Sequence, residues 1–134
     1  MNRDEAIEKY EGALAAWCRA IEKVNQCREY ATRARAEMDA IEAEVVVNGG
    51  LGGVAIDGKN AETRAAQLAM ALAGDGSYNA ARGQYRDWTA GQQDAEAVRD
   101  TAAEEMRFAR AVLALLTAEA NERAYAHGAP GEER

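Results

Sequence analysis

The sequence predicts an all-α protein, a coiled-coil-like antiparallel hairpin of two long helices with a short middle helix and a small tip between them. Two long segments, about residues 4–44 and 76–126, carry apolar residues at steps of three and four, which keep one stripe on one side of a helix. The only proline is Pro130, so no earlier position breaks a helix on that account. Alanine supplies much of the apolar content, which favours helices packed closely along a narrow seam. We expect a single helical domain over residues 1–126.

The first helix is expected over about residues 4–44, with Asp4 as its N-cap. Two successive steps of three around Val24 predict a stammer, which is a local shift in the phase of the apolar stripe. Cys18 and Cys27 are expected to be free thiols, because a rise of about 1.5 Å per residue separates them by about 13 Å along the helix. The predicted stripe contains Ile7, Tyr10, Leu14, Trp17, Ile21, Val24, Cys27, Ala31, Ala34, Met38, Ile41 and Val45.

The tip, residues 45–59, is expected to begin where helical character stops. Val45, Val46 and Val47 are three β-branched residues in a row, which favour extended chain. A glycine-rich segment follows at 48–53, and residues 54–56 favour extended chain again. The tip is therefore predicted either as a small β-hairpin, with 45–47 paired against 54–56, or as a plain flexible loop. The sequence favours the two equally.

The middle helix is expected over residues 61–73, between Asn60 as N-cap and Gly74 as the residue that ends it. Asp75 is expected to cap the third helix, which covers residues 76–126. Gly83 and Gly91 mark either a bend or the close approach of another helix. The predicted seam of the third helix contains Tyr78, Ala81, Tyr85, Trp88, Ala95, Ala102, Met106, Ala109, Leu113 and Leu116, with Gln92 and Arg99 as polar breaks.

The two long helices are expected to pair head to tail. In that register Val45 lies near Tyr78, and Ile7 lies near Leu113 or Leu116. The stripes of these helices are wider than two narrow seams need, which predicts a homo-oligomer. Residues 127–134 are expected to form a disordered tail.

The charge pattern limits the classes of partner that we expect the protein to bind. The net charge is −7, and acidic and basic residues are mixed along both long segments, as on solvated helix faces. We expect no direct nucleic-acid binding, because the basic patch that it needs is absent. An acidic DNA mimic would need carboxylates gathered on one surface. The charged N-terminal segment lacks the apolar region of a secretory signal, and there is no 18-residue apolar run, so we expect a cytoplasmic protein with no membrane partner.

The sequence predicts no catalytic residue, no cofactor and no metal site. Phosphate-binding loops need GxxxxGK[ST] or GxGxxG, and the glycines of the tip match neither pattern. Nucleophilic catalysis needs a base beside the nucleophile, but the only histidine is His127, in the predicted tail. The Glu-x-x-His pairs of di-metal helical bundles are absent as well. The protein is therefore predicted not to be an enzyme.

The predicted partner-binding residues are Leu51, Val54 and Ile56 in the tip, together with Arg64 and Tyr78. The sequence reveals no role within the chain itself, such as packing in its core, for a glycine-rich apolar tip. Apolar residues without such a role mark a protein-binding surface. The expected partner is another protein, from the host or from a phage.

The segment 58–78, GKNAETRAAQLAMALAGDGSY, resembles a stretch of small helical accessory proteins of bacteriophages and prophages. In both, a G-K-N turn opens a short helix with an Arg and a Gln-Leu pair, and an Asp caps a long charged helix that begins with a Tyr. The glycine-rich tip and Gly76, where proline is usual, depart from that pattern. The resemblance implies a phage or prophage origin and a non-enzymatic role.

Within that origin, two roles are expected for protein binding in the host bacterial cytoplasm. One is in DNA recombination, and the other is inhibition of a host defence factor. The alternatives are a structural or chaperone-like coiled-coil oligomer and an acidic DNA mimic.

Overall fold

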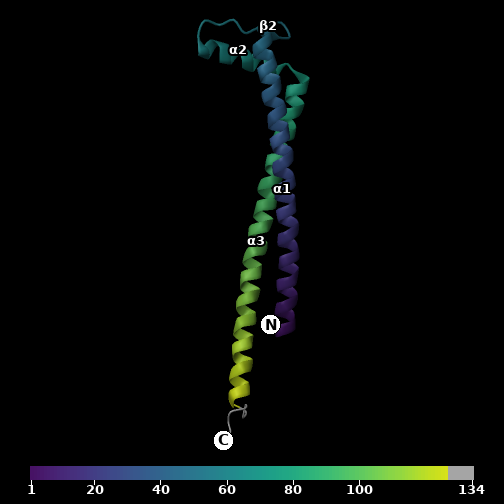
Figure 1. Cartoon of the computed structure of the whole chain (residues 1–134), viewed down its shortest axis with the longest axis vertical. Coiled ribbons are helices and arrows are strands. Elements are labelled where there is room, and N and C mark those ends of the chain that lie inside the picture. The colour runs from purple at the N-terminus through teal and green to yellow at the C-terminus, as the bar shows by residue number, and fades with distance from the viewer. Residues whose placement is uncertain (127–134) are drawn as a thin grey trace. The chain divides into compact units, whose positions relative to one another are not determined.

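The computed structural model describes residues 1–126, which form three helices and two short strands (Figure 1). Helix α1 spans Arg3–Asn48, strand β1 Gly50–Leu51, strand β2 Val54–Ala55, helix α2 Ala61–Ala73 and helix α3 Gly76–Ala126. The predicted hairpin of two long helices with a short middle helix is confirmed. The predicted disordered tail, 127–134 with His127, lies outside the described residues.

Contacts divide the chain into two compact units. Unit 1 contains Met1–Glu22 and the chain from Asp94 onward, and unit 2 is Lys23–Gln93. Each unit therefore holds one segment of α1 and one segment of α3. The expectation of a single domain stays a prediction.

In unit 2 the two long helices run antiparallel. The ring of Tyr30 on α1 stacks on that of Trp88 on α3, with ring centroids 4.7 Å apart. Further along α1, Glu42 accepts a hydrogen bond of 3.2 Å from the hydroxyl of Tyr78, which lies earlier on α3. Tyr78 also packs against the cluster that contains Val45, so the predicted proximity of these two residues is confirmed.

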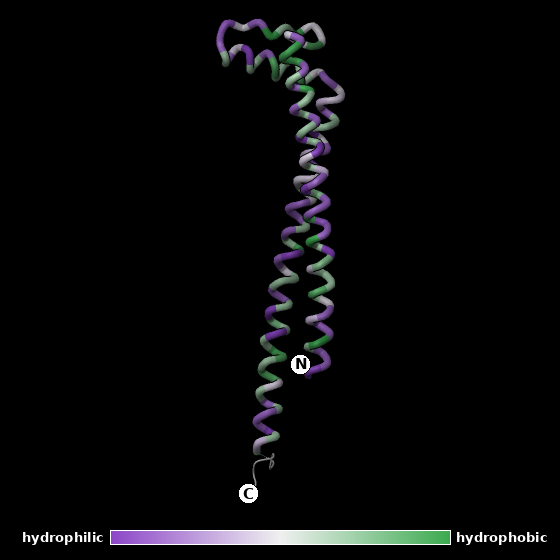
Figure 2. Tube along the Cα trace, in the orientation of Figure 1, coloured by the Kyte–Doolittle hydropathy of each residue, from purple (hydrophilic) through white to green (hydrophobic). Residues whose placement is uncertain are grey.

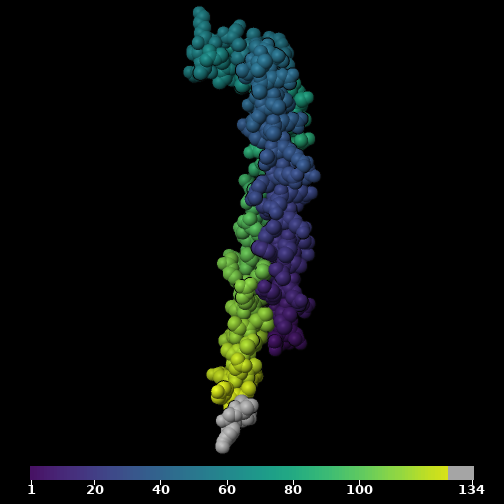
Figure 3. All heavy atoms as spheres, viewed as in Figure 1, coloured from purple at the N-terminus to yellow at the C-terminus, as the bar shows by residue number. Residues whose placement is uncertain are grey.

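In unit 1 the pairing follows the same direction. Arg110 of α3 donates a hydrogen bond of 3.3 Å to the Tyr10 hydroxyl of α1, and its guanidinium lies 5.7 Å from the centre of that ring. A contact between positions 10 and 110 agrees with the predicted approach of Ile7 to Leu113. Figure 3 shows the first turns of α1 lying against α3 in this unit.

The seam of α3 is confirmed, and its buried members are Ala81, Ala95, Ala102 and Ala109. The seam predicted for α1 holds at Tyr10 and Trp17 but is wrong at every second position of its first half. Ala6, Ala13 and Ala20 are buried there, whereas Ile7, Leu14 and Ile21, one position later, lie at its edge. Alanine occupies the centre of the seam because its small methyl group lets the two helix backbones approach closely.

The corrected seam of α1 also removes the predicted stammer. From Ala6 onward one series of buried and half-buried positions alternates steps of four and three past Val24 without a change of phase, with Ile7, Ala16, Ile21 and Glu42 half-buried beside it. The positions of the series are 6, 10, 13, 17, 20, 24, 27, 31, 34, 38, 41 and 45.

Both ends of α1 differ from the prediction. At the N-terminus the cap is Asn2, not Asp4: its side chain accepts a bond of 2.8 Å from the Glu5 amide, and the Glu5 carboxylate faces the Asn2 amide at 3.4 Å. At the C-terminus the helix continues through the three valines to Asn48. Val45 is buried there, and this packing outweighs the few tenths of a kcal/mol by which β-branched residues disfavour a helix.

The hairpin alternative for the tip is confirmed, but with another pairing. Gly50 pairs with Ala55 and Leu51 with Val54, so the predicted pairing of 45–47 with 54–56 is wrong. The loop between the strands is Gly52-Gly53, with φ angles of +59° and +82°. Positive φ at both central residues is the type I′ geometry that suits the twist of a hairpin and favours glycine.

Of the two glycines singled out in α3, Gly91 marks a close approach. A Cβ at this position would lie 3.3 Å from the Sγ of Cys27, which is fully buried. A Cβ at Gly83 would meet nothing within 4 Å. Cys18 is exposed, and both cysteines are free, as predicted.

The predicted caps of α2 and α3 are confirmed. The Asn60 side chain accepts a bond of 2.7 Å from the Thr63 amide, and Gly74 follows the last residue of α2. The Asp75 carboxylate accepts a bond of 2.8 Å from the Tyr78 amide. Hydrophilic residues recur along both long helices (Figure 2), and no helix within residues 1–126 has an apolar stretch long enough to cross a membrane.

The alanine seam makes a direct prediction about stability. We expect Ala81→Leu to lower the free energy of unfolding by about 1–3 kcal/mol, because a larger side chain in a closely packed seam forces the helices apart. The neighbouring Ala80 is exposed on the same helix, so Ala80→Leu is the matched control and should change it by less than about 0.5 kcal/mol. Urea unfolding followed by circular dichroism measures both, and equal midpoints would contradict a tight seam.

Candidate functional site

The tip has a hydrophobic core of its own, within unit 2. Val45, Ala71 and Leu72 are buried together. The partly buried residues that pack against them are Ile41, Val54, Ile56, Leu68 and Tyr78. The premise that Val54 and Ile56 have no intramolecular use is therefore wrong, since both help to fasten the hairpin to α1 and α2.

Gln67 of α2 fixes the segment between β2 and α2. Its side-chain oxygen accepts hydrogen bonds from the amides of Asp57 and Gly58, at 3.0 and 2.9 Å. Its side-chain nitrogen donates a bond of 2.8 Å to the Asp57 carboxylate. One amide group thus satisfies three polar atoms of the connecting segment, which holds the hairpin in one position relative to α2.

Arg64 also has a structural contact. Its Nη1 donates a bond of 3.1 Å to the carbonyl oxygen of Gly58. A Cβ on Gly58 would lie 2.6 Å from a methyl carbon of Thr63, so the start of α2 packs closely against this glycine. The G-K-N turn is therefore held by packing, by the Asn60 cap and by Arg64.

Tyr78 joins the start of α3 to α1 through its bond to Glu42. Burial, and then the negative charge of Glu42, raise the pKa of the Tyr78 hydroxyl above its ordinary value of 10.0. The hydroxyl therefore stays protonated and keeps its donor role through the neutral range.

Three apolar side chains of the tip remain outside this core. Val46 is 53% exposed, Val47 is 84% exposed, and Leu51 is 37% exposed. Leu51 was among the predicted partner-binding residues, but Val46 and Val47 were missed because they were assigned to a strand. The continuation of α1 to Asn48 turns them away from the buried side that Val45 occupies. Met70 on α2 is a fourth exposed apolar residue.

A groove of about 290 Å³ lies beside α2 in the same unit. Its apolar lining comes largely from α2. Tyr78, the acidic Glu42 and the basic Arg82 also line it. The lining residues are Glu42, Ala65, Leu68, Ala69, Leu72, Ala73, Tyr78 and Arg82. Of the five predicted binding residues, the structure places Tyr78 at this groove and Leu51 on the exposed surface of β1.

Among residues 1–126 there is no group of three or more His, Cys, Asp or Glu side chains arranged to hold a metal ion. The tip carries exposed apolar side chains and a groove whose lining includes Glu42 and Arg82. No protein-family model matches the chain, and neither a curated protein nor a solved structure matches it.

We expect Gln67→Ala to release the connecting segment, because the amides of Asp57 and Gly58 lose their acceptor together. The predicted loss of stability is about 1 kcal/mol, with faster hydrogen exchange at these two amides. Gln84 is exposed on α3 and serves as the control, since Gln84→Ala should leave this exchange unchanged. Unaltered exchange in the Gln67 variant would show that the clamp does not hold the segment.

Tyr78 gives a prediction about pH. Because its pKa is raised in the folded state, the folded protein holds this proton more tightly than the unfolded chain. Its contribution to stability is therefore complete below the unfolded pKa of about 10 and is lost as the pH rises through the folded pKa.

Tyr78→Phe should lower the free energy of unfolding by about 1 kcal/mol at neutral pH, through the lost bond to Glu42. The difference between the two proteins should shrink above the ordinary tyrosine pKa. Urea unfolding of both at neutral and at alkaline pH tests this, and a difference that stays constant would refute it.

Proposed function

We propose that this chain is a non-enzymatic, phage-type accessory protein that binds another protein through its tip. It works in the host bacterial cytoplasm, either in DNA recombination or as an inhibitor of a host defence factor. The phage-type role follows from the likeness of residues 58–78, and the binding role follows from the tip itself.

The observation that carries the binding role is the exposure of Val46, Val47 and Leu51. These side chains lie outside the hydrophobic core of the tip, which other residues fill. Exposed apolar side chains on a mobile loop would lose conformational entropy on binding. Here the valines lie on the last turns of α1, and Leu51 lies in a hairpin that is fastened to α2. The surface is preorganised, so binding costs less conformational entropy than it would on a mobile loop.

The groove beside α2 adds a place for one anchoring side chain of the partner. Its apolar lining accepts an aliphatic or aromatic group, while Glu42 and Arg82 offer one charge of each sign. An apolar anchor in a pocket with polar groups around it is the usual form of a strong interface contact.

A structural or chaperone-like coiled-coil oligomer is the second candidate. The observation that favours it is in unit 1, where Val98, Phe108 and Leu115 of α3 are exposed. The two candidates differ in the surface that they use, so variants of the tip and of unit 1 separate them.

The test is capture of the partner from a host lysate with the full chain as bait, followed by mass spectrometry and a titration of the captured protein. Leu51→Asp and Val47→Lys each place a charge on the tip, and lysine at a helix C-terminus does not oppose the helix dipole. We expect each variant to weaken binding at least about tenfold, with helicity unchanged.

Tyr125→Lys is the matched control for Val47→Lys. Tyr125 is also 84% exposed and also lies next to the last residue of a long helix, α3. This variant should bind like the wild type. If both tip variants bind with wild-type affinity, the tip is not the binding surface.

A further inference from the structure

Helix α3 carries a second apolar row in unit 1, beside its buried seam. Thr101, Phe108 and Leu115 each stand one position before a seam residue, which turns them about 100° around the helix. With Val98 and Val112 they form a row at steps of three and four, broken by Glu105. Phe108 is 62% exposed, and Val98 and Leu115 are exposed as well. A two-helix hairpin uses one seam per helix, so this second row lies beside the seam and leaves apolar side chains exposed.

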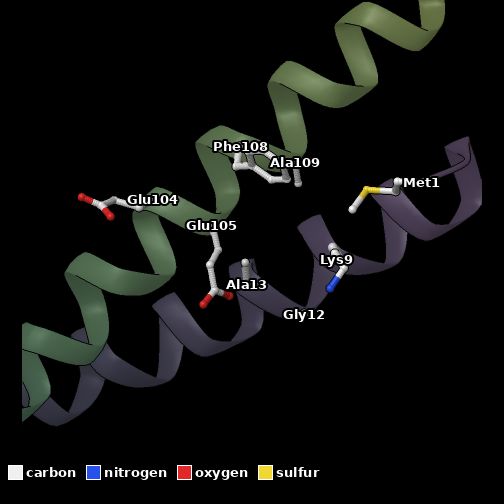
Figure 4. A pocket seen from close by; sticks show the side chains of 8 residues that line it. All are labelled: Met1, Lys9, Gly12, Ala13, Glu104, Glu105, Phe108 and Ala109. Carbon is white, nitrogen blue, oxygen red and sulfur yellow. The ribbon is translucent and has the colours of Figure 1, made fainter.

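A groove lies next to this row. Its volume is about 750 Å³, and it runs between α1 and α3 (Figure 4). Its lining residues are Met1, Lys9, Gly12, Ala13, Glu104, Glu105, Phe108 and Ala109. A second groove of about 220 Å³ continues along Ala16, Val98, Thr101 and Glu105. The α1 side of the grooves includes the small residues Gly12 and Ala16, with Lys9 and Met1 further along, and Phe108 is the largest residue on the α3 side.

One face of unit 1 therefore holds both a ridge and a hollow. The ridge is Phe108 with Val98, and the hollow lies over Gly12 and Ala16. A Cβ added at Gly12 would meet nothing within 4 Å, so the space above this glycine is open. A face with a ridge and a matching hollow complements itself under a twofold rotation.

The charges on this face are also self-complementary. Lys9 lies on the α1 side, and Glu105 projects from α3 towards Ala13, while Glu104 points away from α1 (Figure 4). The ion pairs found in the described part of the chain include neither Lys9 nor Glu105. A twofold partner brings the lysine of one copy to the glutamate of the other, twice.

From the ridge, the hollow and the charges, we infer that this face of unit 1 binds a second copy of the chain as a twofold dimer. Phe108 of each copy enters the hollow over Gly12 and Ala16 of the other. Lys9 of each copy pairs with Glu105 of the other, which gives the charge at the centre of the apolar row a partner. This surface is separate from the tip, and the inference does not rest on the proposed function.

The first test is the mass of the full chain in solution, by size-exclusion chromatography with light scattering. The wild type should have twice the mass of one chain. Phe108→Asp should shift the mass to that of one chain, with helicity retained, because this side chain is mostly exposed in a single copy. Ala114→Asp adds the same charge on another side of the same helix, at an exposed residue, and should leave the dimer intact.

The second test distinguishes this dimer from any other. Lys9→Glu and Glu105→Lys each place like charges opposite one another twice in a homodimer, so each variant should be monomeric. When the two are mixed, both contacts become pairs of opposite charge, and a heterodimer should form. Native mass spectrometry of the mixture measures it, and raised salt should weaken it.

Each other outcome overturns the inference. A wild type with the mass of one chain at every concentration reached shows that the face binds something else. A dimer that survives Phe108→Asp, or that is lost with Leu51→Asp instead, places the contact elsewhere. Failure of the charge-reversed pair to form a heterodimer shows that Lys9 and Glu105 do not meet across a twofold axis.

Discussion

The close approach of two helix backbones along a seam of alanines is the constraint on which the rest of this structure depends. In unit 1 alanine methyl groups fill the central positions of both long helices, and in unit 2 Ala31, Ala34 and Ala81 share the seam with larger residues such as Met38. Each methyl group buries little area, and free energy from burial grows with area at about 25 cal/mol per Å². Stability must therefore come from length, which is why α1 has 46 residues and α3 has 51.

Because the two helix backbones lie close together, large side chains are placed at the edges of the seam. Tyr30 and Trp88 stack across it in unit 2, with Lys23 5.9 Å from the Trp88 ring and Arg33 5.3 Å from the Tyr30 ring. Such stacks and cation–π contacts cover the seam from outside and keep part of each ring exposed. An alanine seam thus leaves more apolar surface to neighbouring chains than a seam of leucines does.

Local signals account for the parts of the fold that the sequence predicted well. The bounds of α2 and α3 follow from Asn60, Gly74 and Asp75, whose caps use atoms only a few residues away. The α3 seam was found because its large and small members share one stripe. In α1 the stripe is wider, and hydrophobicity favours Ile7 over Ala6. Hydrophobicity alone does not reveal which residue lets the partner helix come closest.

Packing between residues far apart in the sequence explains why the predictions for the tip were wrong. The three valines favour a strand by themselves, but the buried site for Val45 is made by Ala71 and Leu72, which lie on α2. The sequence therefore identified Leu51 as exposed for a reason that did not hold for Val54 and Ile56. Whether an apolar residue of a short hairpin faces its own core or a partner is decided by its pairing register, because a shift of one residue reverses every side chain.

That register is set by the two-glycine turn, and α2 holds the hairpin in place. The bonds of Gln67 to Asp57 and Gly58 fasten the segment after β2 to α2. The capping residues of α2 in turn fix where Gln67 stands along the helix. Exposure of Leu51 therefore depends both on the turn, which sets its pairing with Val54, and on α2, which the hairpin packs against. The glycines permit the turn, and the helix determines which face of the hairpin is covered.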